Sequence, residues 1–251
     1  MSDVPTMAPT PSGIPFLKPF PGTPDEVAGG EPAARACAAH DLAGPLAAQA
    51  LATLPAHVPA QGLLRTLPAP SPVAGQPLMR ALSLRHSTRE YLPTPLSMRQ
   101  LADVLWSAGG VNRPGDGRTV PYWRHPTGVS VYAVMTDGVW LYEPGLHALR
   151  QHLGIDLRAQ TGIQDFVGTA PLNLVYVVHG ERMEELPADE RRLRGSVDAA
   201  FAGQNVYLYC ASEGLGCVFR DALDADLLAH AMRLSAGQFV VFAQTVGYPA
   251  A

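Results

Sequence analysis

Two arginines, a histidine and two hydroxyl side chains stand together in the stretch Arg85-His86-Ser87-Thr88-Arg89. A guanidinium group can fork onto phosphate oxygens, and Ser and Thr hydroxyls can donate to the same anion. If the stretch is helical, Arg85 and Arg89 lie on one face, where a single ligand could touch both. The stretch therefore predicts a phosphate site, although a short basic run is also typical of an ordinary solvated surface.

The sequence from Arg85 to Tyr91 resembles the N-terminal signature of the nitroreductase family, the FMN-dependent oxidoreductases. Four later segments resemble the same family in the same order, namely 97–110, 169–177, 203–216 and 246–249. The resemblance extends over roughly 76–249 and is strongest to the branch that includes the thiazoline- and oxazoline-oxidising dehydrogenases of peptide maturation. It implies an α+β, nitroreductase-like three-layer fold, with a central mixed sheet flanked by helices and an intertwined homodimer.

The resemblance also gives roles to the residues of the signature. Arg85 and Ser87 are expected to bind the phosphate of FMN, with His86 adding a ring N–H. Arg89 matches a cationic position near the pyrimidine edge of the flavin, where a positive charge favours the acceptance of hydride. A salt bridge with Glu90 or another surface carboxylate is the plainer role for Arg89.

A second group of expected cofactor-binding residues follows the long helix that the resemblance places at 203–214. Members of the family lay backbone against the reactive edge of the flavin here, and Gly216, Phe219 and Arg220 occupy that position. Glycine allows a close backbone approach. A simple helix C-cap at Gly214 or Gly216 explains the glycines equally well.

The chain departs from the family in the loop at 119–127. His125 stands where Asn is expected, Tyr122 replaces a small hydroxyl residue and Thr127 replaces Gln. A histidine can still donate one hydrogen bond, and Tyr122 or Trp123 could stack on the flavin ring. The alternative is that this loop does not touch flavin at all.

A second departure concerns the phosphate clamp, because many relatives carry a Lys or Arg after Gly-Tyr-Pro. Here Gly-Tyr-Pro is followed by Ala250 and Ala251. One phosphate cation is then missing unless Arg118, Arg124 or Arg220 substitutes for it.

The resemblance implies FMN as cofactor and NADH or NADPH as electron donor, with a nitroaromatic or quinone as the small-molecule acceptor in a ping-pong cycle. No catalytic residue is evident, because hydride transfer from a nicotinamide needs no general base. Oxidising an azoline would need one, and the single lysine, Lys18, stands far from the signature. Tyr122, His125 or Tyr207 are the remaining candidates. The alternative function is a flavin-poor, non-redox partner or binding subunit that keeps the fold.

Composition narrows the remaining classes. The 251 residues are 47% hydrophobic and 16% charged, which is enough for one sizeable core, and the net charge of −4 gives no general attraction to nucleic acid or membranes. No apolar run is long enough to span a bilayer, no secretory signal is recognisable, and Cys37, Cys210 and Cys217 lack metal-ligand spacing. We expect a cytoplasmic protein without a metal site, since His147 and His152 also lack a helical spacing.

Residues 1–75 are rich in Pro, Ala and Gly, which predicts a partly disordered N-terminal extension before a domain at 76–251. The extension could be a linker, a lid or a tail that wraps a partner subunit. The charged run at 181–194 reads as a solvated loop or lid. Within the domain, hydrophobic periodicity and turn signals predict helices at 77–84, 97–110, 196–214 and 224–232, and strands at 129–136, 139–142, 172–178 and 238–246.

Overall fold

The computed structural model describes residues 62–122 and 128–250. The chain divides into units 1–41 and 42–251, and all described residues belong to the second. Its helices and strands are α2 (Leu78–Leu84), α3 (Met98–Gly109), α4 (Ala188–Glu213), α5 (Ala225–Ala231), β1 (Leu64–Thr66), β2 (Val111–Arg113), β3 (Gly117–Arg118), β4 (Val129–Met135), β5 (Gly138–Glu143), β6 (Ala148–Leu153), β7 (Leu172–His179), β8 (Gly216–Arg220) and β9 (Gln238–Gly247), with 3-10 turns at Arg158–Thr161, Asp165–Gly168 and Gly180–Arg182.

The central sheet has seven strands in the order β1-β6-β5-β4-β7-β9-β8, and β2 and β3 form a separate ribbon. The resemblance implied a mixed sheet, but every pairing of neighbouring strands in the described residues is antiparallel. The reason is the position of β9. Helix α4 carries the chain from β7 to β8 in the same direction, and β9 lies between those two strands and runs against both.

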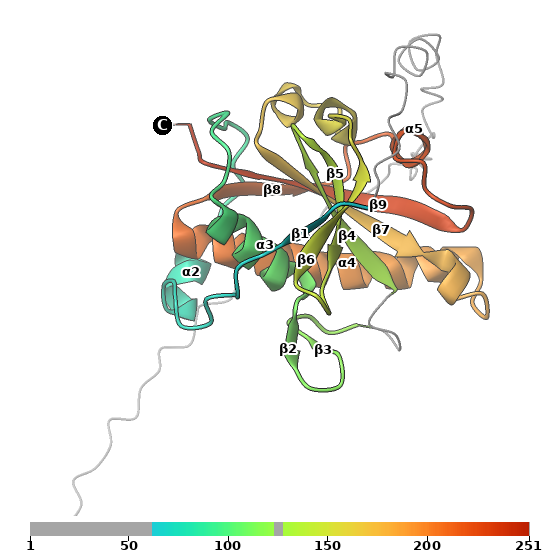
Figure 1. Ribbon diagram of the computed structural model, residues 1–251, viewed down its shortest axis with the longest axis horizontal. Coiled ribbons are helices and arrows are strands. Elements are labelled where there is room, and N and C mark those ends of the chain that lie inside the picture. The colour runs from blue at the N-terminus through green and yellow to red at the C-terminus, as the bar shows by residue number, and fades with distance from the viewer. Residues whose placement is uncertain (1–61, 123–127, 251) are drawn as a thin grey trace, which may run out of the picture. The chain divides into compact units, whose positions relative to one another are not determined.

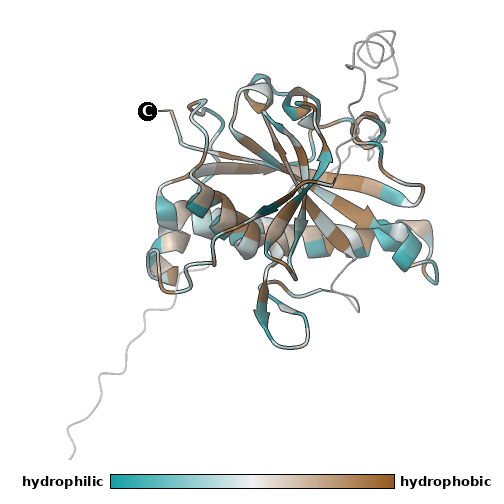
Figure 2. Ribbon diagram, viewed as in Figure 1, coloured by the Kyte–Doolittle hydropathy of each residue, from teal (hydrophilic) through white to brown (hydrophobic). Residues whose placement is uncertain are grey.

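Two apolar layers cover the sheet, which gives the expected three-layer α+β architecture (Figure 1). On one face, buried side chains of α3 and α4 such as Leu105 and Val206 pack against β4 and β7. On the other face, Leu228 and Met232 of the α5 region pack against Val177 of β7. Figure 2 shows apolar residues concentrated along the central strands. Strand β7 is buried at every position, as expected for a strand covered on both faces.

Helix α3 forms where the sequence predicts it. The Ser97 side chain accepts from the backbone N–H of Gln100, and the Gln100 side chain accepts from the backbone N–H of Ser97, so the capping box is complete. The apolar stripe behind it is buried, and the helix ends at Gly109.

Helix α4 is longer than expected, because it begins at Ala188 instead of residue 196. Part of the charged run read as a loop is therefore its first two turns. Asp189 and Glu190 stand in the first turn, where carboxylates interact favourably with the positive end of the helix dipole. Glycines allow the helix to approach the sheet closely: an added Cβ at Gly203 would lie 2.4 Å from the Phe219 ring.

Part of the segment assigned to the extension joins the sheet. Strand β1 pairs with β6, Leu67 is only 5% exposed, and the backbone N–H of Ser71 donates to the buried Asp103 carboxylate at 3.0 Å. Residues 64–71 are thus structurally part of the domain. The proposed roles of 1–61 lie outside the described residues.

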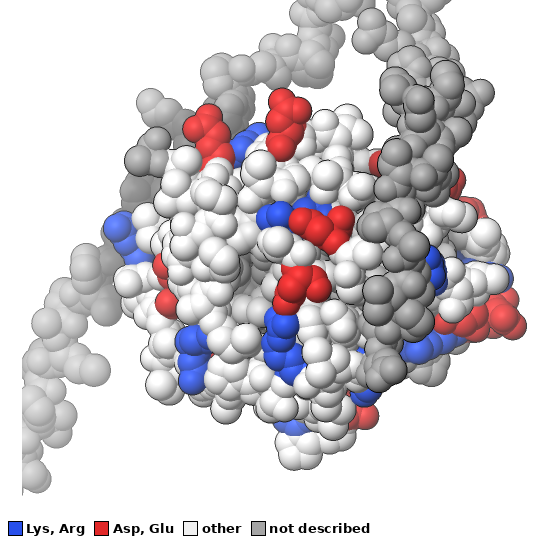
Figure 3. Space-filling model, turned by 45° about the horizontal axis from the view of Figure 1, so that its top comes forward, with Lys and Arg blue, Asp and Glu red and all other residues white. Residues whose placement is uncertain are grey.

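Strands β1, β2, β3, β6 and β8 are absent from the elements predicted from the sequence. None of the helices described in the structure is both long and apolar enough to cross a lipid bilayer. On the face shown in Figure 3, basic and acidic side chains are interspersed.

Candidate functional site

The Arg85–Arg89 stretch lies along the outer edge of β8. Helix α2 ends at Leu84, and Arg85 has an extended ψ of 120°. The helical spacing assumed for Arg85 and Arg89 is therefore wrong. The physical reason is competition from the sheet, because the backbone N–H of Thr88 donates to Cys217 O at 2.9 Å and holds the stretch against the strand.

The Tyr207 hydroxyl connects this stretch to α4 and β8. It lies 2.8 Å from Ser87 Oγ and accepts the backbone N–H of Phe219 at 2.9 Å. The Arg85 guanidinium carbon lies 5.3 Å from the centre of the Tyr207 ring, in cation–π range. One side chain of the core helix therefore positions two residues of the predicted phosphate site.

The remaining polar groups of the stretch face outward or have no partner. His86 and Arg89 are exposed, and His86 Nδ1 lies 2.8 Å from Leu84 O. Thr88 Oγ1 is buried and has no hydrogen-bond partner among the described residues. An added Cβ at Gly216 would lie 2.7 Å from the Thr88 side chain, so the glycine is required where strand and stretch meet.

The segment at 246–249 lies beside the same stretch. Tyr91 forms a β-bridge with Pro249, Leu92 N–H donates to Tyr248 O at 2.9 Å, and Ala250 N–H donates to Glu90 O at 3.0 Å. Three of the five segments that resemble the family, at 85–91, 203–216 and 246–249, thus meet at one end of the sheet.

The Arg220 side chain is buried, and the Phe219 side chain is half-buried. Arg220 is 6% exposed, and its guanidinium donates to Thr161, Asn173 and Thr245. Burial lowers the pKa of Arg220 to about 10. These internal bonds engage all three nitrogens of the guanidinium. The Phe219 ring packs between aromatic side chains, 4.7 Å from the Phe242 ring centre.

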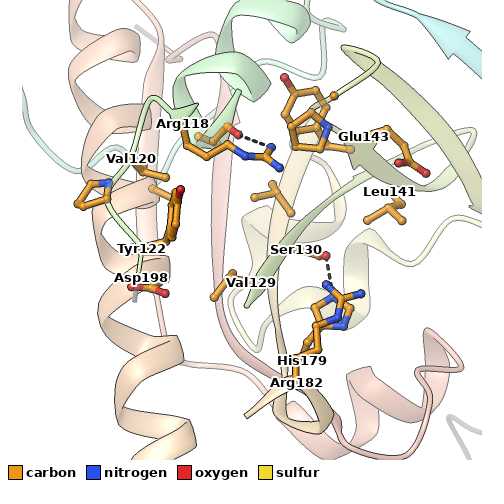
Figure 4. Close-up of a pocket in the computed structure, with 18 residues that line it drawn as sticks. Arg118, Val120, Tyr122, Val129, Ser130, Leu141, Glu143, His179, Arg182 and Asp198 are labelled. Atoms are coloured by element: carbon orange, nitrogen blue, oxygen red, sulfur yellow. Dashed lines mark hydrogen bonds between the residues drawn. The ribbon is translucent and has the colours of Figure 1, made fainter. Parts of the chain in front are cut away.

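A larger cavity, of about 390 Å³, lies elsewhere in the domain and has none of the signature residues in its wall. It is bounded by the end of α3, the start of β4, the β5–β6 turn and the middle of α4 (Figure 4). The cavity wall includes three described residues of the altered loop, Val120, Pro121 and Tyr122. Asn205 of α4 holds this loop by donating to Thr119 O at 3.0 Å.

A chain of hydrogen bonds that runs from Ser130 through His179 to Glu181 lies at one polar side of the cavity. Ser130 Oγ lies 2.7 Å from His179 Nε2, and His179 Nδ1 lies 2.8 Å from a Glu181 carboxylate oxygen (Figure 4 shows the first contact). Burial lowers the pKa of His179, and the hydrogen bond to Glu181 opposes that shift in part. These contacts were not predicted from the sequence. Glu181, at the start of the charged run, is the only one of the three residues that lies in a segment singled out there for its charge.

Four other residues named from the sequence lie outside the described residues or away from the signature stretch. His125, Arg124 and Thr127 lie outside the described residues. Arg118, one candidate for the missing phosphate cation, lies on the large cavity instead of beside the signature.

The cysteine prediction agrees with the described structure. Cys210 and Cys217 are free and buried, as expected, and burial raises the pKa of the Cys210 thiol. Among the described residues no group of His, Cys, Asp or Glu side chains is placed to hold a metal ion. His147 bonds instead to Tyr142 Oη and Pro68 O, both at 2.9 Å.

The chain matches the model of the nitroreductase family over residues 82–248. It belongs to that family, and membership supports an oxidoreductase function. A curated relative, "Putative nitroreductase MJ1384" of Methanocaldococcus jannaschii, is 31% identical over 144 residues, which are 53% of this chain and 73% of the relative.

Solved structures share the fold. A protein of Ralstonia eutropha JMP134, named a "putative nitroreductase", has a TM-score of 0.72 and 41% identity to this chain. The match covers 79% of this chain and 100% of that one. The NADPH:FMN oxidoreductase of Vibrio harveyi, solved with NAD+, has a TM-score of 0.52 at 20% identity, covering 69% of both chains. The second likeness shows the fold alone.

Proposed function

We propose that the protein is an FMN-dependent oxidoreductase that uses NADH or NADPH to reduce a small acceptor of the nitroaromatic or quinone type. The observation that carries this proposal is the meeting of the signature stretch with β8 and the C-terminal segment. Arg85, His86 and Arg89 stand outside the packed core there, and Ser87 is held in place by Tyr207. We expect FMN as the cofactor because the chain belongs to the nitroreductase family.

The donor set fits the phosphate of FMN. A guanidinium, an imidazole and a hydroxyl within three consecutive residues can converge on one anion. The flavin ring does not fit into the single chain at this place, since the hollow beside His86 and Tyr207 measures only about 10 Å³. A second wall from a partner subunit would complete such a site.

A homodimer supplies that wall in our proposal. Leu193, Val197 and Phe201 follow one another at four-residue spacing on α4 and are 59%, 44% and 45% exposed. Side chains at this spacing share one helix face. A contiguous apolar stripe on a helix surface is typical of a subunit contact.

When bound, FMN supplies the hydride chemistry. The residues of this chain bind and orient it: Arg85 and Ser87 hold the phosphate, and Arg89 places a positive charge close to the same segment. Gly216 keeps the backbone of β8 free of a side chain where it adjoins Thr88. We assign no general base, because hydride transfer from a nicotinamide needs none.

Two finer readings are weaker. Azoline oxidation, the reaction of the branch that the sequence resembles, would need a base such as the Lys-Tyr pair of that branch, and Lys18 lies outside the described residues. A non-redox partner subunit is favoured by the altered loop at 119–127 and by the tiny hollow beside the signature. Bound flavin separates this reading from the enzyme.

An FMN titration of the purified full chain, followed by absorbance, tests the enzyme. We expect stoichiometric uptake, and Arg85→Ala should weaken it by about ten- to a hundredfold, since a charge-assisted contact contributes about 1.5–3 kcal/mol. Arg80→Ala, an exposed arginine on α2, is the matched control and should bind normally. A protein that takes up no FMN would favour the partner subunit.

Light scattering tests the dimer. Phe201→Asp places a charge in the apolar stripe and should yield monomers with weakened FMN binding. Leu146→Asp is the control, because Leu146 is comparably exposed, at 59%, but lies in the β5–β6 turn. A wild-type monomer that binds flavin stoichiometrically would remove the proposed subunit contact.

A further inference from the structure

We propose that the large cavity binds a small aliphatic carboxylate, with the Arg118 guanidinium as its counter-ion. The proposal concerns a site separate from the signature stretch and does not depend on flavin binding. It is carried by a buried charge without a described acidic partner, in the wall of a cavity of about 390 Å³.

The Arg118 side chain is almost fully enclosed, since the residue is 9% exposed. Its only hydrogen bond in the described structure runs from Nη1 to Gly109 O, at 3.1 Å, and Nε has no partner. A guanidinium has five N–H donors and remains charged in proteins. A buried charge normally requires a partner of opposite charge, and no described carboxylate forms an ion pair with Arg118.

Neither acidic residue of the wall forms an ion pair with Arg118 in the described structure. Glu143 already pairs with Arg150 at 2.7 Å, outside the cavity. Asp198 is on the α4 wall, and Figure 4 places it well away from the Arg118 guanidinium. Arg182, the other cation of the wall, is exposed. The end of the cavity at Arg118 is therefore the place where an incoming anion is most strongly favoured.

The rest of the wall indicates what the anion is attached to. Val120, Val129, Val131, Leu141 and Ala202 present aliphatic carbon to the cavity. Each methylene moved from water into such surroundings contributes about 0.8 kcal/mol. A short branched chain carrying one carboxylate satisfies both parts: the planar acid forks onto the guanidinium, and the chain occupies the apolar wall.

A purely structural role is the competing explanation for Arg118. Its bond to Gly109 O satisfies a carbonyl at the end of α3, where a cation also interacts favourably with the helix dipole. That role accounts for one donor and for a loss of stability on mutation. It does not predict that the cavity distinguishes a charged ligand from a neutral one of the same shape.

Calorimetric titration of the full chain with 4-methylpentanoate and with 4-methylpentanamide makes this distinction. We expect the acid to bind at least about tenfold more tightly than the amide, because only the acid neutralises the guanidinium. Arg118→Gln should bring the ratio close to one, and Arg118→Lys should keep part of it. Arg182→Gln, at an exposed cation of the same wall, should leave the ratio nearly unchanged.

The outcomes separate the explanations. Equal affinity of wild type for acid and amide, or no heat with either, overturns the proposal, and so does a charge preference that survives Arg118→Gln and disappears in Arg182→Gln. If Arg118→Gln fails to fold, the wild-type ratio and Arg118→Lys still decide. An FMN titration of the same variants should be unaffected, so failure of this proposal and failure of the flavin proposal are distinguishable.

Discussion

Removing the Tyr207 hydroxyl tests the arrangement that holds the predicted phosphate site. Tyr207→Phe deletes one oxygen and keeps the ring beneath Arg85. The deleted atom accepts the Phe219 N–H at 2.9 Å and lies 2.8 Å from Ser87 Oγ. A backbone donor left without its acceptor costs about 1–3 kcal/mol when it is buried. Phe219 is only partly buried and Ser87 is exposed, so we expect a loss of about 1–2 kcal/mol.

For a chain of this size, 1 kcal/mol shifts Tm by about 2–4 °C, so Tyr207→Phe should melt roughly 2–8 °C below wild type. The FMN dissociation constant should rise by about three- to tenfold, because Ser87 loses the partner that fixes it. Tyr209→Phe is the matched control on the same helix, since the Tyr209 hydroxyl has no hydrogen-bond partner in the described part of the chain. Equal melting temperatures for both variants and wild type would refute this account of the site.

Three further predictions concern the stability of the domain. Leu67→Ala should cost about 2–3 kcal/mol in chemical denaturation, because the side chain is 5% exposed, whereas Leu63→Ala, at 56% exposed, should cost little; equal effects would contradict the inclusion of this segment in the domain. Deleting residues 1–30 should leave Tm nearly unchanged, but deleting 1–71 should lower it, since the second deletion removes β1 and the partner of Asp103; identical scans for the two truncations would show that β1 contributes nothing. Burial lowers the pKa of His179 below its ordinary 6.5, so its contribution to stability is present above that pH and is lost as pH falls below it; unfolding at pH 7.5 and 5.5 should show a smaller decline in His179→Gln, and parallel declines would count against it.

Much of the domain could be predicted from local sequence patterns. The capping box at Ser97 and the Asp224 cap mark helices α3 and α5, and the continuous apolar run of β7 marks a strand buried on both faces. These signals act between residues close together in the chain. Strand β8 is not among the predicted strands, because its formation depends on pairing with β9, about 25 residues later.

The sequence indicated which residues belong to the candidate site better than it indicated how they are arranged in space. Residue types indicated that Arg85 and Ser87 belong together, but a helical spacing could not reveal that β8 holds the stretch extended. The expected role of Arg220 met a similar obstacle: its partners Thr161, Asn173 and Thr245 come from three distant parts of the chain. Side chains that meet only through tertiary packing leave no periodic pattern in the sequence.

The position of the signature stretch has a consequence for the behaviour of the protein in solution. Strand β8 is the last strand of the sheet, and such edges invite pairing with other chains. Thr88 occupies the carbonyl of Cys217, and Tyr207 occupies the N–H of Phe219, so two of the outward backbone groups of β8 are already satisfied. Because the signature stretch and Tyr207 use these groups, fewer free backbone groups of β8 can pair with another chain, which should reduce aggregation. A variant that loosens the signature stretch should show its defect first as self-association on storage, before any change in the core is detected.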